Sequence, residues 1–200
     1  ARAGARAWGC VVTEHGMMFR AELVRAILAG QKTETRRLLV PSAVFVVERD
    51  SGRRAPRPQG FADLLARSSA RTWYGEPSIS LPAHPDLVAL PRVQAGDALW
   101  VRETWRAWAT DGAGDCLRVE YRADHTHRDL RHDGDWSVPS AVARGGWGSA
   151  VHLPRWACRL VLPVVEVRVE RLQSIDDAGA RAEGCESRDD FARLWDSLAP

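Results

Sequence analysis

The chain has 200 residues, 45% of them hydrophobic, so it is long enough to bury one sizeable core, and a single domain is predicted. Its formal net charge of +2 excludes a uniformly basic nucleic-acid coat, although its 27 arginines could still form a local patch. The four separated cysteines contain no Cys-x-x-Cys pair, and no apolar run approaches the ~20 residues that span a bilayer, so we expect a cytoplasmic protein without membrane contact, zinc knuckle or disulfide framework.

Residues 1–16 are rich in Ala, Arg and Gly and are predicted to be a flexible N-terminal extension, with the ordered domain spanning residues 17–200. Apolar residues then recur at helical spacing between Arg20 and Ala29. Gly30 follows where a left-handed C-terminal cap belongs, so this helix is predicted to end there.

Residues 41–91 carry many Pro and Arg residues without sustained periodicity. This composition predicts a long insertion of loops and short elements. The insertion could be a lid or a variable excursion.

Three later segments are predicted to be strands. A turn at Gly96-Asp97 leads into an alternating strand that ends near Trp105, and residues 116–121 alternate in the same way, as expected for an antiparallel neighbour. Residues 157–172 give the strongest strand signal, with a bulge or break expected at Pro163.

Two short helices are predicted to close the chain. Ser174 and Asp177 have the spacing of a capping box, and Gly184 is placed to end that helix. Ser187 and Asp190 repeat the signature before an amphipathic stripe. The predicted fold class is therefore α+β: a strongly curved, mostly antiparallel sheet or small barrel with short flanking helices.

Lys32 is the only lysine in the chain. Where a cation is needed for charge or phosphate contact, an arginine offers a planar fork of donors and stays protonated. A lysine can instead be driven toward its neutral form by burial or by a neighbouring cation, and can then act as a base, acid or nucleophile. The alternative is that Lys32 lies by chance on a solvated turn.

Several sequence blocks carry a family resemblance. They are Gly30–Arg37, Gly96–Trp105, Leu153–Arg159, Val167–Gln173 and Phe191–Leu198. Together, and in this order, they resemble the ASCH domain of the PUA-like superfamily in its phage and prophage branch. The resemblance implies a small β-barrel with a cleft beside the turn at Lys32 that binds RNA or a modified nucleoside.

The resemblance also implies a possible reaction. One ASCH group hydrolyses N4-acetylcytidine with a lysine, a threonine three positions later and a glutamate, which correspond here to Lys32, Thr35 and Glu183; another ASCH member is a ribonuclease. In a regular strand Lys32 and Thr35 would point to opposite faces, so their cooperation requires a turn or bulge. The alternative is that Thr35 is an ordinary strand residue and Glu183 a solvated helix end.

For nucleic-acid binding, Arg36 and Arg37 would meet phosphates beside Lys32, or stabilise an oxyanion, and Arg102 would line the pocket or pair with Glu103. Loop-proximal tryptophans would stack a splayed base. The stacking candidates are Trp105, Trp108 and Trp147, whereas Trp100 and Trp195 are expected in the core.

Three functions stay open from the sequence. The first is binding of RNA, a modified nucleoside or single-stranded DNA around Lys32. The second is metal-independent hydrolysis by Lys32, Thr35 and Glu183, without a cofactor. The third is a structural or interaction role in a phage particle. Residues 125–133 contain His and Asp residues, but their irregular spacing favours a solvated loop over a metal site.

Overall fold

The computed structural model describes residues 12–38, 44–48, 50–51, 53–56, 58–59, 69–73, 76–81, 84, 86–109, 116–131 and 145–197. The chain forms two compact units, whereas the sequence predicted one domain with an insertion. The first unit includes Arg36–Asp97 and Pro163–Ile175, and the second comprises Glu14–Thr35, Ala98–Leu162 and Asp176–Pro200. The predicted insertion, residues 41–91, falls within the first unit.

The first unit contains a five-stranded antiparallel sheet in the order β3-β2-β6-β5-β4. Its strands are β2 (Val44–Glu48), β3 (Arg54–Ala55), β4 (Ser69–Trp73), β5 (Glu76–Ser80) and β6 (Leu87–Pro91). Val46 and Ile79 both lie opposite Ala89, and all three are buried. The sequence predicted only loops and short elements in this Pro- and Arg-rich stretch, so the sheet went unpredicted.

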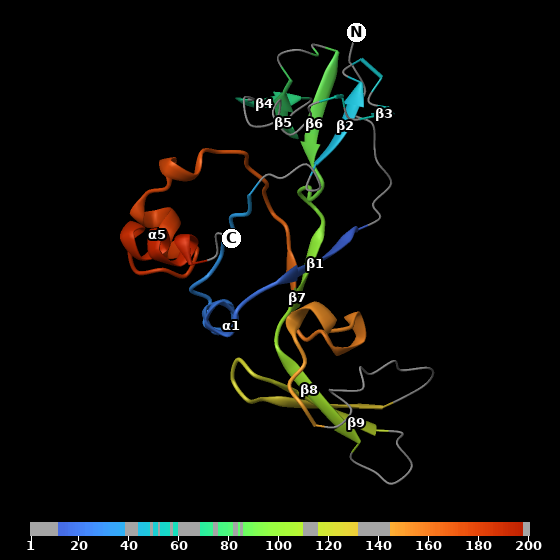
Figure 1. Ribbon diagram of the computed structural model, residues 1–200, viewed down its shortest axis with the longest axis vertical. Coiled ribbons are helices and arrows are strands. Elements are labelled where there is room, and N and C mark those ends of the chain that lie inside the picture. Colours follow the sequence, from blue (N-terminus) through green and yellow to red (C-terminus); the bar gives the residue numbers. More distant parts are fainter. Residues whose placement is uncertain are drawn as a thin grey trace. The chain divides into compact units, whose positions relative to one another are not determined.

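The second unit begins with β1 (Glu14–Met18) and α1 (Ala21–Leu28), which follow one another in Figure 1. β1 starts before residue 17 and pairs in parallel with β7 (Ala98–Arg102), in a sheet of order β1-β7-β11. Phe19, Val24, Val101 and Ala123 form a buried cluster there. The amphipathic stripe of α1 therefore covers this sheet, as its helical periodicity predicted.

A second sheet of this unit consists of β8 (Trp105–Ala109), β9 (Cys116–Tyr121) and β10 (His127–Arg131), antiparallel in the order β10-β9-β8. Its buried face carries Trp105, Ala107, Val119 and Tyr121. The short 3-10 turns η2 (Ala150–His152) and η3 (Arg155–Ala157) follow, and Leu153, Ala157 and Cys158 complete the cluster. The strand predicted at residues 116–121 is confirmed and is antiparallel, but its neighbours are β8 and β10, whereas the predicted neighbour, β7, lies in the other sheet.

Two helices and a 3-10 turn occupy the C-terminal part: η4 (Leu172–Ser174), α4 (Asp177–Ala182) and α5 (Arg188–Asp196). Ser187 caps α5 by accepting from the backbone N–H of Asp190, as predicted. The N-cap of α4 is Asp176, which accepts from Gly179, so the predicted capping by Ser174 is wrong. Asp176 lies closer to the first residue of α4 than Ser174 does, and its carboxylate makes the capping hydrogen bond that was predicted for the Ser174 hydroxyl.

The glycine caps are confirmed. Gly30 and Gly184 have φ angles of +71° and +89°, in the left-handed region. In α4 the N–H of Cys185 bonds to Ala180 O and that of Gly184 to Arg181 O, the hydrogen-bond pattern of a Schellman motif. Gln31 and Gly30 make the corresponding bonds at the end of α1.

The α+β class is confirmed, but the described strands form separate sheets and no closed barrel. The strand predicted for residues 157–172 is largely wrong, because only β11 (Val161–Pro163) forms and it ends at Pro163, where a break was expected. Val165 is 85% exposed, so this β-branched residue does not pack in the buried face of a sheet. Among the helices of the described residues, none combines the length and apolar composition needed to cross a membrane.

Candidate functional site

The segment that follows α1 is held by backbone hydrogen bonds at the ends of two helices. The N–H groups of Gln31 and Lys32 both bond to Ala26 O in α1. Those of Thr33 and Glu34 both bond to Ala182 O, in the last turn of α4. Residues 31–38 form neither helix nor strand. In a strand Lys32 and Thr35 would point to opposite faces, but this constraint does not hold for an irregular segment.

Lys32 and Glu183 form a buried ion pair. The Lys32 Nζ lies 2.5 Å from Glu183 Oε2, and the two side chains are 3% and 7% exposed. The same Nζ donates to the backbone oxygens of Glu183 at 2.9 Å and Glu34 at 2.6 Å. An ammonium has three N–H donors, so these three oxygens can use all of them. The alternative of a solvated Glu183 is wrong, and so is the placing of Lys32 on a solvated turn.

Thr35 is half-buried and follows the residue whose carbonyl accepts from Lys32. The peptide bond between Glu34 and Thr35 therefore lies against the Lys32 amine. The structure thus brings Lys32 and Glu183 together, although 151 positions separate them, and places the backbone of Thr35 beside them.

Gly184 allows this close packing. A Cβ at Gly184 would lie 3.2 Å from the Cβ of Ala26 and 3.4 Å from that of Lys32. The neighbouring Cys185 thiol is buried, and this burial raises its pKa. A raised pKa disfavours the thiolate, so Cys185 is a poor nucleophile beside the pair.

The arginines predicted to bind phosphate are differently placed. Arg36 is half-buried and ion-paired with Glu170, at 2.9 Å from Nη2 to Oε1. Arg37 is exposed. Because a carboxylate occupies its fork, Arg36 is a weaker candidate for a phosphate or an oxyanion than the sequence suggested.

The predicted stacking role of Trp105 is wrong, because its side chain is fully buried in the core of the β8–β9–β10 sheet. Its ring packs edge-on against Trp156, with centroids 5.9 Å apart. Trp108 is half-buried, with the Arg106 guanidinium 5.4 Å from its ring centroid. Strand alternation explains the difference, since residues 105 and 108 point to opposite faces of β8.

Arg102 does not pair with Glu103. Its guanidinium carbon lies 5.2 Å from the centroid of Trp100, which is only half-buried and packs against the core. The Nε of Arg102 is buried and has no hydrogen-bond partner among the described residues. Arg102 and Trp108, two of the predicted binding residues, thus each take part in an Arg–Trp contact.

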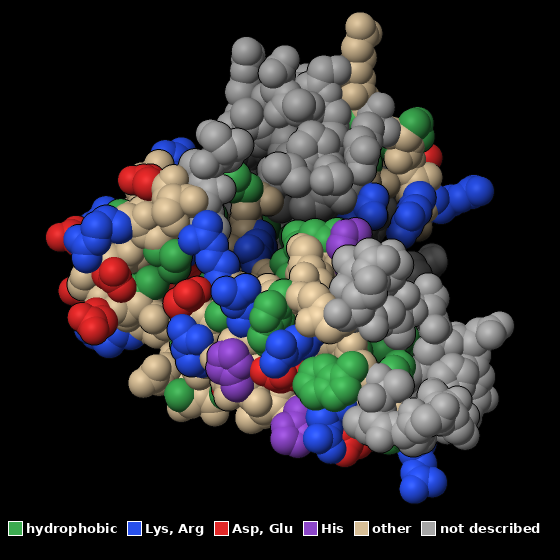
Figure 2. Space-filling model, turned by 60° about the horizontal axis from the view of Figure 1, so that its bottom comes forward, with side chains coloured by type: hydrophobic (Ala, Val, Ile, Leu, Met, Phe, Trp, Pro, Cys, Tyr) green, Lys and Arg blue, Asp and Glu red, His purple; other side chains and the backbone are tan. Residues whose placement is uncertain are grey.

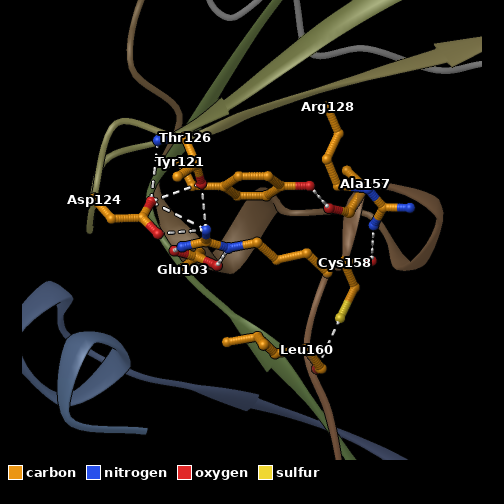
Figure 3. Close-up of polar contacts among 9 residues, drawn as sticks. Glu103, Tyr121, Asp124, Thr126, Arg128, Ala157, Cys158 and Leu160 are labelled. Carbon is orange, nitrogen blue, oxygen red and sulfur yellow. Dashed lines mark hydrogen bonds and ion pairs between the residues drawn. The ribbon is translucent and has the colours of Figure 1, made fainter. Parts of the chain in front are cut away.

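A polar network that the sequence did not predict centres on Arg159 (Figure 3). Its Nε and Nη2 each donate to a carboxylate oxygen of Glu103 at 2.8 Å. Its Nη1 donates to Asp124 at 2.8 Å and to Thr126 Oγ1 at 2.5 Å. The guanidinium also lies 4.2 Å from the ring centroid of Tyr121. All three nitrogens of the guanidinium are used, so Arg159, two residues after η3, links Glu103, directly after β7, to the β9–β10 turn.

Burial is the largest single influence on the pKa values of Glu103, Tyr121 and Asp124. It raises the pKa of Glu103 despite the opposing bonds from Arg159, and it raises the pKa of Tyr121 to about 12. Burial also acts to raise the pKa of Asp124, but the hydrogen bonds from Arg159 and Thr126 outweigh it and lower that pKa. Arg159 escaped prediction because it is one of 27 arginines. Glu103, a carboxylate directly after an apolar strand, was the available signal.

The metal alternative gains no support. The described residues contain no group of three or more His, Cys, Asp or Glu side chains arranged to hold a metal ion. His125 and His127 are exposed, while His132 and Asp133 lie outside the described residues.

Comparison of the chain with protein-family models, with curated proteins and with solved structures finds no match. The resemblance to the ASCH domain therefore stays a prediction.

Proposed function

We propose that the chain is a hydrolase of acylated nucleosides that uses Lys32, Glu183 and Thr35. The observation that carries the proposal is the buried Lys32–Glu183 pair, with its 2.5 Å contact. Buried ionisable groups with a specific charged partner are concentrated at functional sites, although structural ion pairs share the feature.

The use of a lysine and not an arginine at position 32 distinguishes a catalytic role from a structural one. In the same unit the chain builds a buried ion pair with an arginine, Arg159, which fixes Glu103 through two parallel hydrogen bonds. At position 32 it uses its only lysine. An arginine serves a structural pair well, whereas a lysine can also lose its proton in a protein. The lysine is therefore better explained by proton transfer than by structure alone.

The proposed reaction has two proton transfers. Lys32 in its neutral form takes a proton from the Thr35 hydroxyl or from a water as that oxygen forms a bond to the acyl carbon. The bond from carbon to the nucleobase nitrogen then breaks, and the leaving nitrogen receives a proton from the pair. Glu183 exchanges protons with Lys32 across their short contact. If Thr35 carries the acyl group, one water then attacks the ester carbon, gives a proton to the pair and releases the carboxylic acid, and the Thr35 oxygen takes a proton back.

The burial of the pair favours an amide substrate over an RNA phosphodiester. Because the Lys32 side chain is 3% exposed, a small acyl group reaches it more readily than a phosphodiester between two nucleotides. The same burial argues against Lys32 as a phosphate contact, since its amine already meets three protein oxygens. The RNA-binding hypothesis therefore needs another surface.

The test is hydrolysis of N4-acylated cytidines of increasing acyl length by the purified chain, followed by the change in nucleobase absorbance. Thr35→Val, Glu183→Gln and the double variant Lys32→Met with Glu183→Gln are compared with the parent. The double variant replaces a buried charged pair by neutral side chains of similar shape, so it is expected to fold. We expect kcat to fall about 100-fold or more in the lysine and glutamate variants.

Glu186→Gln is the matched control, because Glu186 is an exposed carboxylate just beyond the same helix. Its kcat should equal that of the parent. Turnover that survives in a folded double variant, or no hydrolysis of any acylated cytidine by the parent, contradicts the proposal.

A further inference from the structure

The face of the β8–β9–β10 sheet opposite its buried cluster carries charged and aromatic side chains. Strand alternation places the residues between the buried Trp105, Ala107, Val119 and Tyr121 on the opposite face. Along the ladder, Arg106 lies opposite Glu120, and Trp108 lies opposite Arg118. On β10, His127, Asp129 and Arg131 continue this face. This face therefore combines Arg106, Arg118 and Arg131 with Trp108.

Arginine and tryptophan side chains alternate on this surface. The Arg106 guanidinium lies 5.4 Å from the ring centroid of Trp108 and 4.7 Å from that of Trp147. The guanidinium of Arg122, at the end of β9, lies 5.6 Å from the centroid of Trp147. His125 meets the same ring edge-on at 6.0 Å. These contacts hold the planar groups in place before any ligand arrives.

The charges of this surface are only partly compensated. Glu120 accepts from Arg106 and contacts His125, and Asp129 is bound by Arg118 through two hydrogen bonds. Arg122 and Arg131 are exposed and have no carboxylate partner within the described part of the chain. No carboxylate of the described residues therefore competes with an anion for these two guanidinium groups. Figure 2 shows basic, acidic and histidine side chains interspersed on the face of the molecule that it draws.

We propose that this surface, formed by Arg106, Trp108, Arg118, Arg122, Arg131 and Trp147, binds single-stranded nucleic acid. Unpaired bases stack on aromatic rings and on guanidinium planes, here Arg106 and Arg118, whose donors are bound to Glu120 and Asp129. The donors of Arg122 and Arg131 bind the phosphates. A duplex hides its base faces, so it cannot use the planar groups. The proposal does not depend on the hydrolase activity, because none of its residues belongs to the Lys32 site.

The test measures fluorescence anisotropy of the full chain with labelled oligouridine, oligothymidine of equal length and a duplex of equal length. Arg122→Gln and Trp147→Leu are compared with the parent. Loss of a stacked base is expected to weaken binding about 5- to 150-fold. Arg122→Gln changes an exposed residue, so it keeps the test valid if the tryptophan variant folds poorly. A preference for oligouridine over oligothymidine would assign the surface to RNA.

Arg193→Gln serves as the control, since it removes the same charge from an exposed position on α5. Equal weakening by the control, equal affinity for the duplex, complete displacement by heparin at equal charge, or no binding by the parent would each overturn the proposal. Hydrolysis of acylated cytidine should be unchanged in Arg122→Gln and Trp147→Leu. A failure of this surface is therefore distinguishable from a failure of the Lys32 site.

Discussion

Arg155 and Arg159 each bind a carboxylate through two nitrogens, but in different surroundings. Arg155 and its partner Glu14 are exposed, whereas Arg159 is 10% exposed and its partner Glu103 is buried. Removal of Arg159 leaves Glu103 charged and unpaired in the interior, so Arg159→Ala should lower the free energy of unfolding by about 3–5 kcal/mol.

Urea denaturation followed by circular dichroism measures this loss. Arg155→Ala is the control and should change the midpoint little, because water replaces an exposed partner. Arg159→Lys should fall between the two, since an ammonium cannot form the paired bonds to Glu103. Similar midpoints for Arg159→Ala and Arg155→Ala would show that the network contributes little stability.

Tyr121 should make stability depend on pH in the alkaline range. Its hydroxyl donates to Ala157 O at 2.7 Å, and burial raises its pKa from 10.0 to about 12. The folded form binds the phenolic proton more tightly than the unfolded form, so its contribution is complete below pH 10 and is lost as the pH rises toward 12.

The absorbance of tyrosinate and the midpoint of urea unfolding are measured across this pH range. The parent should lose stability between pH 10 and 12, and Tyr121→Phe should lose less over the same interval. Tyr121→Phe should also remove the tyrosinate signal that appears near pH 12. Identical pH profiles for the parent and Tyr121→Phe would refute the assignment.

At the scale of residues, the sequence predicted which side chains could be reactive better than it predicted their burial and their contacts. The uniqueness of Lys32 marked it for attention, but its pairing with Glu183 came from a family resemblance, because contacts between residues 151 positions apart leave no local pattern. Trp105 and Trp108 look alike in the sequence, and only the register of β8 decides which one is buried.

Gly184 and Gly30 end helices with the same motif but different neighbours. A Cβ at Gly30 would meet no atom within 4 Å, whereas one at Gly184 would crowd the Cβ of Ala26 at 3.2 Å and touch that of Lys32 at 3.4 Å. Both glycines have positive φ, so either substitution by alanine costs roughly 1–2 kcal/mol for the backbone alone. Gly184→Ala should therefore destabilise the fold more than Gly30→Ala.

Thermal unfolding of the two variants measures the difference. Gly184→Ala should also lower kcat in the proposed hydrolysis, because the added methyl group would lie only 3.2 Å from the Cβ of Ala26, whose carbonyl accepts from the Lys32 N–H, whereas Gly30→Ala should affect kcat less. Equal melting temperatures for the two variants would show that the space beside Lys32 is not restrictive.

At the scale of elements, the predictions succeeded where the determinants are local. The helix at residues 21–28, both glycine caps and the cap at Ser187 depend on neighbours within a few positions. The parallel pairing of β1 with β7 and the sheet within residues 41–91 depend on distant partners, so they were missed. Residues 164–171 have the composition of a strand but form none; Val165 is exposed, whereas Val169 packs against the buried cluster of Val46, Ile79 and Ala89 without joining the sheet.

At the scale of the molecule, the chain is divided into two units that each consist of separate stretches of sequence. Composition predicted enough apolar residues for one core, but it cannot show how contacts divide them. The Lys32 pair, the Arg159 network and the nucleic-acid surface proposed above all belong to the second unit. The first unit holds Arg36, its partner Glu170 and the sheet built from the predicted insertion.

The burial of the only lysine also gives the protein an internal reporter of its own opening. An amine-reactive ester modifies exposed primary amines, and the Lys32 side chain is 3% exposed. In the folded protein, acylation of Lys32 should be slow, and it should become fast in denaturant. Mass spectrometry of the peptide that contains Lys32 would then time the opening of the second unit without any engineered label.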